Sequence, residues 1–202
     1  MEFLIQLVIF LPSIIIALTV HEFSHAWVAY KLGDPTAKAE GRLTFNPLAH
    51  LDPLGTIMLI LFRFGWGKPV PINEYNFKNP VVGTALSSIA GPTSNLLLAL
   101  LTTAIFHIFT PTNIFLNAFL LYFILINIVL MIFNLLPIPP LDGHKVIRAL
   151  LPKSLRYGWE SLESYSPYIL IFTLFIIVYT GALSKIMYTI LELLIPQYYL
   201  YL

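Results

Sequence analysis

The chain has 202 residues, of which 58% are hydrophobic and only 10% are charged, and its net charge is +1. An ordinary soluble domain has about 45–50% apolar and about 25% charged residues, so the expected partner is the lipid bilayer. The balanced charge gives no support for nucleic-acid binding. The absence of cysteine excludes disulfides and thiolate metal ligands, which leaves His, Asp, Glu or Asn to hold any metal ion.

Long uncharged stretches predict several membrane-spanning helices. Residues 3–20 carry no charge, and the helix that they begin is expected to stop at Gly33-Asp34-Pro35. Asn79–Leu141 contains 63 consecutive residues without Asp, Glu, Lys or Arg. This is enough for two passes, because one helical pass needs about 20 apolar residues. A further uncharged run of 21 residues, Ser164–Ser184, also qualifies. The expected spans are residues 3–32, 81–109, 114–136 and 164–184.

The segment between the first two spans is expected to contain a β-hairpin and a re-entrant piece. Ala37–Phe45 alternates weakly in polarity between two prolines, which favours a short strand or hairpin. Residues 54–64 are apolar, but a helix of that length reaches only about 16 Å and cannot cross a core of roughly 30 Å. The predicted fold class is an all-α polytopic membrane protein. We expect one domain over residues 1–202, a helical transmembrane bundle with this hairpin or re-entrant segment.

The basic residues predict the orientation of the chain in the cell membrane. Ten of the eleven Lys and Arg lie either between the first and second spans or after the third, and the turn between spans two and three has none. Because loops rich in Lys and Arg stay in the cytoplasm, both basic regions are expected there. The amino terminus is then expected outside, and the site described next lies toward the cytoplasmic side of this multi-pass protein.

The sequence HEFSH, residues 21–25, stands at the end of the first uncharged run. Residues four apart project from one face of a helix, so the imidazoles of His21 and His25 can reach one metal ion. In an H-E-x-x-H arrangement the two His bind zinc and the Glu, here Glu22, takes a proton from the water that the zinc activates. Chance is the alternative, but ionisable groups near the centre of a membrane helix cost about 2.5–3.5 kcal/mol each and rarely persist without a role.

A catalytic zinc site needs a third protein ligand, because such sites have three as a rule. Asp142 is the strongest candidate, since the preceding stretch NLLPIPPL contains three prolines that deny a regular helix its hydrogen bonds. Membranes tolerate irregular backbone only where protein or a water-lined cavity surrounds it. An ordinary Asp-Gly turn at the membrane surface is the alternative for Asp142. The remaining candidates are His50, Asp52, His107 and His144.

Three motifs together resemble a known family. They are HEFSH at 21–25, GPTSN at 91–95 and NLLPIPPLDG at 134–143. With these motifs the chain resembles a short prokaryotic member of the site-2 protease family of intramembrane zinc metalloproteases, a form without PDZ or regulatory domains. The resemblance implies that His21, His25 and Asp142 hold one Zn²⁺ per chain and that Glu22 is the general base. It also implies hydrolysis of a peptide bond in or near the transmembrane segment of membrane-protein substrates, as in regulated intramembrane proteolysis.

Two asparagines are further site candidates. The resemblance implies that Asn134 is catalytic and positions the substrate carbonyl or stabilises its oxyanion; an amide can donate to developing negative charge. The alternative for Asn134 is a hydrogen bond between helices. Asn95 follows Gly91-Pro92, where helices can approach closely, so it either lines the cavity and binds substrate or bonds a neighbouring helix.

Other functions could use the same metal ligands. A metal-binding transporter would need acidic or His side chains along a path, and spans two and three do not offer such a chain. A non-catalytic membrane scaffold would not need Glu22 beside both His ligands. For proteolysis, a helical substrate must unwind, and a strand edge within Ala37–Val70 is expected to hold it by β-addition.

Overall fold

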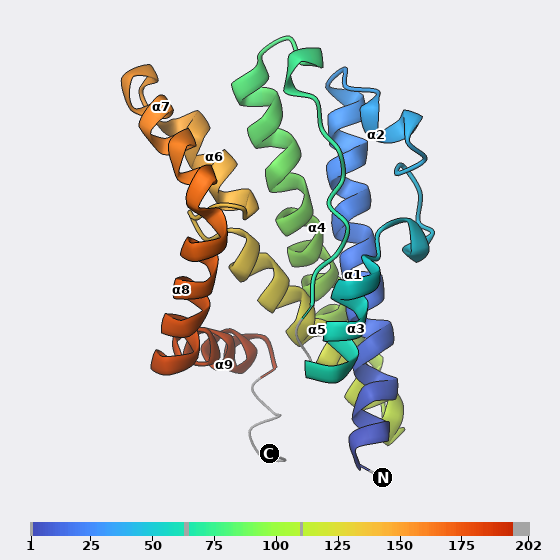
Figure 1. The fold of residues 1–202 in the computed structure, drawn as a ribbon. Coiled ribbons are helices and arrows are strands. Elements are labelled where there is room, and N and C mark those ends of the chain that lie inside the picture. Colours follow the sequence, from blue (N-terminus) through green and yellow to red (C-terminus); the bar gives the residue numbers. More distant parts are fainter. Residues whose placement is uncertain (1, 63–64, 110, 196–202) are drawn as a thin grey trace.

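The computed structural model describes residues 2–62, 65–109 and 111–195, and this part of the chain forms helices joined by turns and extended segments, without a strand. The longest helices run side by side, and shorter ones lie at the ends of the bundle (Figure 1). The α-helices are α1 (Glu2–Lys31), α2 (Thr36–Ala39), α3 (Pro53–Phe62), α4 (Pro80–Phe109), α5 (Ile114–Asn134), α6 (Asp142–Leu150), α7 (Lys153–Glu160), α8 (Ser166–Thr180) and α9 (Ala182–Leu194). Single 3₁₀ turns occupy Pro47–Ala49, Glu74–Asn76 and Ser161–Tyr165.

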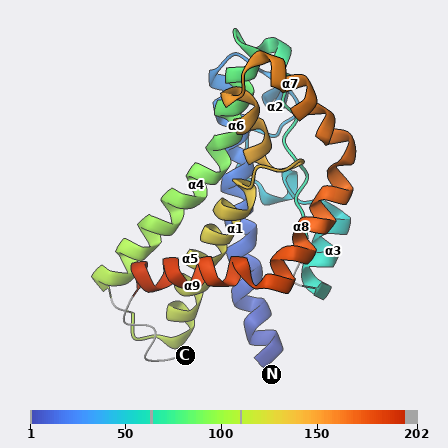
Figure 2. The same cartoon turned by 90° about the vertical axis from the view of Figure 1, so that its left-hand side faces the viewer.

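Four helical stretches of the described chain are long and apolar enough to cross a membrane, which confirms the predicted multi-pass helical class. The prediction for the last span was wrong at its carboxyl end. Gly181 adopts a left-handed conformation with φ of 62°, which ends α8 at Thr180. Helix α9 then leaves crosswise to α8 rather than extending it (Figure 2). The four stretches are Val8–Lys31, Pro80–Phe109, Ile114–Asn134 and Lys153–Thr180.

Helices α1, α4 and α5 pack against one another and form the centre of the molecule. Small side chains on α1 and α4, among them Ala17, Ala29 and Ala99, are completely buried, which lets the helix axes approach closely. In contrast, the membrane-length stretch that includes α8 buries none of its residues in the protein. An apolar helix with that much exposed surface is suited to lipid contact.

The predicted β-hairpin is not present. Thr36–Ala39 forms the one-turn helix α2, because the Asp34 carboxylate accepts hydrogen bonds from the backbone N–H and the hydroxyl of Thr36 and so starts a helical turn. Gly41 then turns the chain with φ of 69°. The only β-type pairing in the described residues is an isolated bridge between Leu51 and Gly67. The part of Ala37–Val70 that the structure describes therefore has no strand whose edge could clamp a substrate, contrary to expectation.

The chain between α1 and α4 descends beside α1 and returns to the end from which it started, as Figure 1 shows. Helix α3 lies on this excursion and spans ten residues, and its re-entrant or interfacial position in the membrane stays a prediction. The returning part, residues 65–79, we call the strap. Three contacts fix it beside α1: the Lys68 N–H donates to the His50 carbonyl, the Arg42 guanidinium donates to the Lys68 carbonyl, and the Asn73 N–H donates to Asp34.

Asp34 is the main anchor of the strap. Its carboxylate is completely buried and accepts from the Asn76 amide at 2.7 Å and the Asn73 N–H at 2.8 Å, in addition to its bonds with Thr36. Burial by itself would raise the pKa of Asp34. The hydrogen bonds from these neighbours outweigh burial and hold the pKa below its usual value.

Replacing Asp34 with Ala is expected to destabilise the protein by about 2–3 kcal/mol, because the buried donors of the strap lose a charged acceptor. Thermal or denaturant unfolding in detergent measures the change, and Glu40→Ala at an exposed site nearby is the control. Since folding lowers the pKa of Asp34, its stabilising contribution is complete above about pH 4 and is lost as the pH falls through the lowered value. Equal stability of the two variants would show that Asp34 does not anchor the strap.

The segment between α5 and α6 carries most of the NLLPIPPLDG motif and determines the position of Asp142. Residues 135–141 form irregular turns part-way along the bundle, and α6 continues from them toward the end that carries α2 and α7 (Figure 1). Gly143 lies so close to the carbonyls of Leu135 and Leu136 that no Cβ would fit there. This close approach folds the chain back and sets Asp142 at the first position of α6.

Candidate metal centre

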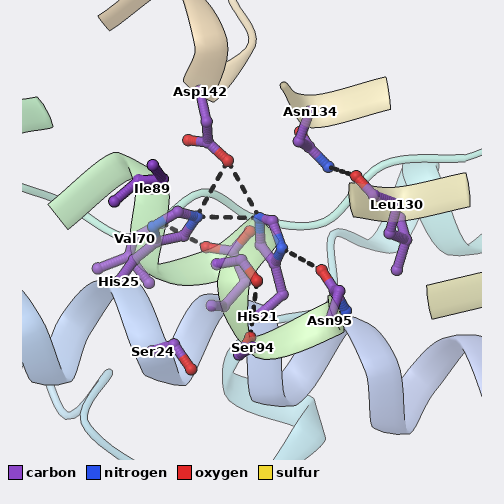
Figure 3. Close-up of polar contacts among 12 residues, drawn as sticks. His21, Ser24, His25, Val70, Ile89, Ser94, Asn95, Leu130, Asn134 and Asp142 are labelled. Carbon is purple, nitrogen blue, oxygen red and sulfur yellow. Dashed lines mark hydrogen bonds and ion pairs between the residues drawn. The ribbon is translucent and has the colours of Figure 1, made fainter. Parts of the chain in front are cut away.

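Three side chains from α1 and α6 converge on one point. The Nε2 atoms of His21 and His25 are 2.9 Å apart, and each lies 3.3 Å from Oδ2 of Asp142. Figure 3 shows the Asp142 carboxylate descending from α6 toward both imidazoles. Within the described residues, this is the cluster of His, Asp and Glu side chains whose geometry could hold a metal ion.

The spacing of these donors fits a tetrahedral zinc ion. Ligand atoms at about 2.0–2.2 Å from a tetrahedral centre lie about 3.3–3.6 Å from one another. The two distances to Asp142 match this value, and the shorter distance between the imidazoles corresponds to a narrower angle. Two imidazoles and one carboxylate form a ligand set known for catalytic zinc, with a fourth position left for water or substrate.

Hydrogen bonds behind the imidazoles aim their Nε2 atoms at the centre. His21 Nδ1 lies 2.6 Å from Oδ1 of Asn95, and His25 Nδ1 lies 2.7 Å from the backbone carbonyl of Ser87. Both partners are oxygen acceptors, so each Nδ1 carries the proton and each Nε2 keeps a lone pair for a metal. Both acceptors belong to α4, which therefore supports the whole centre from one side.

Gly91 allows α4 to approach the imidazoles this closely. A Cβ at this position would press against Nε2 of His25 and would lie 2.6 Å from Cε1 and Nε2 of His21. Real Cβ contacts are longer than 3.0 Å, so any side chain here would displace the two rings. The first residue of the GPTSN motif is thus explained by packing against the metal ligands.

Glu22 lies beside the centre and is 9% exposed. Its Oε2 accepts a hydrogen bond from the backbone N–H of Val70 in the strap at 3.0 Å. The strap thereby orients one carboxylate oxygen of Glu22, and the other oxygen makes no hydrogen bond among the residues that the structure describes. Because Glu22 follows His21 directly on α1, the carboxylate borders the same cavity as the imidazoles.

A cavity of about 140 Å³ opens on the centre. Its walls combine the middle of the strap with polar groups from α1, α4, α5 and α6. It is lined by His21, Glu22, His25, Pro69, Val70, Ile72, Ser88, Asn134, Pro140, Asp142 and Lys145.

The centre lies deep along a candidate membrane span. His21 is 13 residues from the start and 10 residues from the end of Val8–Lys31, so it stands near the middle of that stretch. At the helical rise of about 1.5 Å per residue, the ligands lie about 15 Å from the basic end of α1.

Comparison with known proteins assigns the chain to a family. It is 44% identical over 172 residues to "Putative zinc metalloprotease YwhC" of Bacillus subtilis (strain 168), and the match covers 81% of this chain and 78% of that protein. Residues 107–177 match the model of Peptidase family M50, the site-2 protease family. The chain belongs to this family.

Other relatives of this M50 peptidase carry the same designation. Rip2 of Mycobacterium tuberculosis (strain H37Rv) is 33% identical over 138 residues, which cover 66% of this chain and 53% of Rip2. MJ0611 of Methanocaldococcus jannaschii is 33% identical over 133 residues, or 63% of each chain. No solved structure matches the chain. The predicted family and its class of enzyme, a zinc metalloprotease with membrane helices, are confirmed.

The two predicted asparagines of this M50 peptidase lie in different places. Asn95 is completely buried behind His21, where its Nδ2 donates to Oδ1 of Asn127 at 2.9 Å and to the Ala17 carbonyl at 3.3 Å. The structure thus places Asn95 against the ligand and not in the cavity lining. Asn134 does line the cavity, and its Nδ2 donates to the Leu130 carbonyl at 3.0 Å within the same helix (Figure 3).

Asn127 is a residue that the sequence did not single out. It is completely buried on α5, where its Nδ2 donates to the Phe123 carbonyl at 2.8 Å, so its Oδ1 is turned toward Asn95. This arrangement fixes the Asn95 amide with its oxygen toward His21. A chain of two amides therefore sets the proton position on the imidazole. The sequence signal was a polar residue in the middle of a strongly apolar helix, seven residues before Asn134.

Replacing Asn127 with Leu is expected to weaken zinc binding by about 10–100-fold, the range typical of partners that orient a metal ligand. The Asn95 amide could then rotate and present its NH₂ group to His21. Competition with a chelator of known affinity measures the change. Asn117→Leu on the same helix is the control, because the Asn117 amide donates to the Pro111 carbonyl at the other end of α5, away from the metal centre. Equal zinc affinity in both variants would contradict the role of Asn127.

The remaining His and Asp candidates lie outside the centre. His50 is buried and its Nε2 contacts the Thr44 carbonyl, while Asp52 accepts from the Gly55 N–H at the start of α3. His144 stacks on Trp159 with ring centroids 5.0 Å apart, and His107 contacts the Leu194 carbonyl. All four therefore have contacts that belong to the fold.

Proposed function

We propose that this M50 peptidase is an intramembrane protease that hydrolyses a peptide bond in or near the transmembrane segment of a membrane protein. The observation that carries the proposal is the convergence of His21, His25 and Asp142 beside Glu22, near the middle of a candidate span. A protease whose substrates lay in water would not need its reactive groups at that depth, where ionisable side chains are costly.

In this proposal His21, His25 and Asp142 hold one zinc ion per chain. When bound, zinc supplies a Lewis acid that makes water nucleophilic near neutral pH. Glu22 acts as general base through the carboxylate oxygen that Val70 does not engage, and it takes the proton of the attacking water. Glu22 then gives this proton to the nitrogen of the leaving fragment, so that the carboxylate is restored.

Asn134 is proposed to assist at the substrate carbonyl. One N–H of its amide bonds the Leu130 carbonyl, which leaves the second N–H available in the cavity. A fixed donor of this kind stabilises the negative charge that develops on the carbonyl oxygen during attack. Asn95 holds His21 in this scheme instead of binding substrate.

The proposed orientation follows the basic residues. Lys31, Lys38 and Lys153 all belong to the end of the bundle where α1 ends and α7 begins. The positive-inside rule supports a cytoplasmic location for this end. The cavity then communicates with the cytoplasmic half of the bilayer, and a substrate is cut there, as in regulated intramembrane proteolysis.

One experiment tests the proposal against metal transport. The purified protein is placed in liposomes together with a labelled single-pass membrane peptide, and a zinc-sensitive dye is enclosed in the vesicles. We expect peptide fragments cut within the apolar segment and no zinc influx. Zinc influx without fragments would instead indicate a transporter, and neither signal with bound zinc would indicate a scaffold.

A further inference from the structure

Ser88 on α4 differs from the other buried hydroxyls of the bundle. It is 1% exposed, and its Oγ has no hydrogen-bond partner among the residues that the structure describes. Several other buried hydroxyl groups on α1 and α4 donate to a carbonyl of their own helix. Examples are Ser13 to Ile9 at 2.8 Å, Ser87 to Gly83 at 2.8 Å and Thr103 to Ala99 at 2.8 Å.

An unpaired buried hydroxyl needs a reason, because leaving it without a hydrogen bond is unfavourable. Ser88 could rotate to bond its own helix, as its neighbour Ser87 does, yet it lines the catalytic cavity. It shares this wall with Glu22 and Asn134. Ser88 therefore belongs to the cavity wall that a bound molecule would contact, with its hydroxyl just beneath the surface of that wall.

The backbone of Ser88 carries a second polar group without its usual partner. In a helix its carbonyl would accept from the N–H of the residue four positions later, but that residue is Pro92, which has no N–H. Ser88 thus combines a hydroxyl donor with a carbonyl that has lost its helical donor. A peptide group has the complementary pair, a C=O that accepts and an N–H that donates.

We propose that Ser88 is a substrate-binding residue that hydrogen-bonds the backbone of the unwound polypeptide next to the scissile bond. The inference rests on the proposed function, since only a peptide substrate brings an unwound backbone into the cavity. Inside a membrane each unpaired backbone group of that segment is strongly unfavourable, so partners for it promote unwinding. Ser88 is adjacent to Ser87, whose carbonyl holds His25, and this adjacency places the bound peptide group beside the metal centre.

The test measures substrate binding separately from cleavage. The probe is a synthetic single-pass peptide with a Gly-rich centre, and its dissociation constant is determined with Glu22→Gln protein in detergent, where no cleavage occurs. We expect Ser88→Ala in this background to raise the dissociation constant about 3–10-fold, the loss of one hydrogen bond. Ser88→Thr, which keeps the hydroxyl, should restore most of the binding. Zinc content should stay unchanged in both.

Ser13→Ala is the matched control, because it removes an equally buried hydroxyl that is satisfied inside its own helix far from the cavity. Equal binding by the Ser88→Ala and Ser13→Ala proteins would overturn the assignment. Tight, Ser88-dependent binding by a wild-type protein that cuts nothing would support Ser88 and contradict the proposed protease function. The two hypotheses can therefore fail separately.

Discussion

Glu22→Gln is expected to reduce peptide hydrolysis by about 10²–10⁴-fold while the protein still binds zinc. The amide keeps the shape of the side chain and can still accept the Val70 N–H through its oxygen. It cannot take a proton from water. Because Glu22 is not one of the three converging donors, the metal ligands are unchanged. Cleavage of a labelled membrane peptide and zinc content, measured on the same preparation, check both parts.

Glu192→Gln on the exposed face of α9 is the control for this prediction, since it makes the same chemical change away from the centre. It should cleave and bind zinc like the wild type. A Glu22→Gln protein that cleaves at an undiminished rate would exclude Glu22 as the base. Loss of zinc in that variant would instead assign Glu22 to the metal ligands.

Gly91→Ala is expected to weaken zinc binding by about 10–100-fold, in line with the 1–3 kcal/mol typical of overpacking. The added methyl group would press on Nε2 of His25 and stand 2.6 Å from the His21 ring. Either the rings or α4 must move, and in both cases the donors no longer converge. Cleavage is expected to fall by about 10²-fold, because a small misplacement of reacting groups has an effect of this size.

Gly158→Ala provides the control for the added methyl group. Gly158 is also helical, and a Cβ there would meet no atom within 4 Å. This variant should bind zinc and cleave normally. If Gly91→Ala behaved like Gly158→Ala, the close contact between α4 and the imidazoles would not be present in solution.

The sequence was sufficient to predict the membrane spans and the two histidines of the metal centre. Membrane helices satisfy their backbone internally, so an uncharged run of about 20 residues has few alternatives to a helix. The pair of His21 and His25 follows from helical periodicity alone. Asp142 was a candidate from its proline-rich setting, but its convergence with the imidazoles depends on how α1 and α6 both pack on α4, which no local pattern contains.

Short segments were the least predictable part. Ala37–Phe45 was expected to be extended on weak alternation, but a local side-chain bond from Asp34 and the positive φ of Gly41 gave turns. The Val70 N–H that orients Glu22 is a backbone group 48 residues away, so no side-chain pattern could reveal it. Asn127 was overlooked because it belongs to none of the three motifs, although its spacing of seven residues puts it on the same helix face as Asn134.

Zinc-edge X-ray absorption on the purified protein, combined with metal analysis, tests the metal centre most directly. We expect one zinc ion per chain, bound by two imidazole nitrogens and by oxygen at about 2.0–2.2 Å, with an Asp142→Ala variant losing an oxygen ligand or the ion itself. A protein that holds no stoichiometric zinc, or whose zinc has no imidazole ligands, would contradict the assignment of His21, His25 and Asp142.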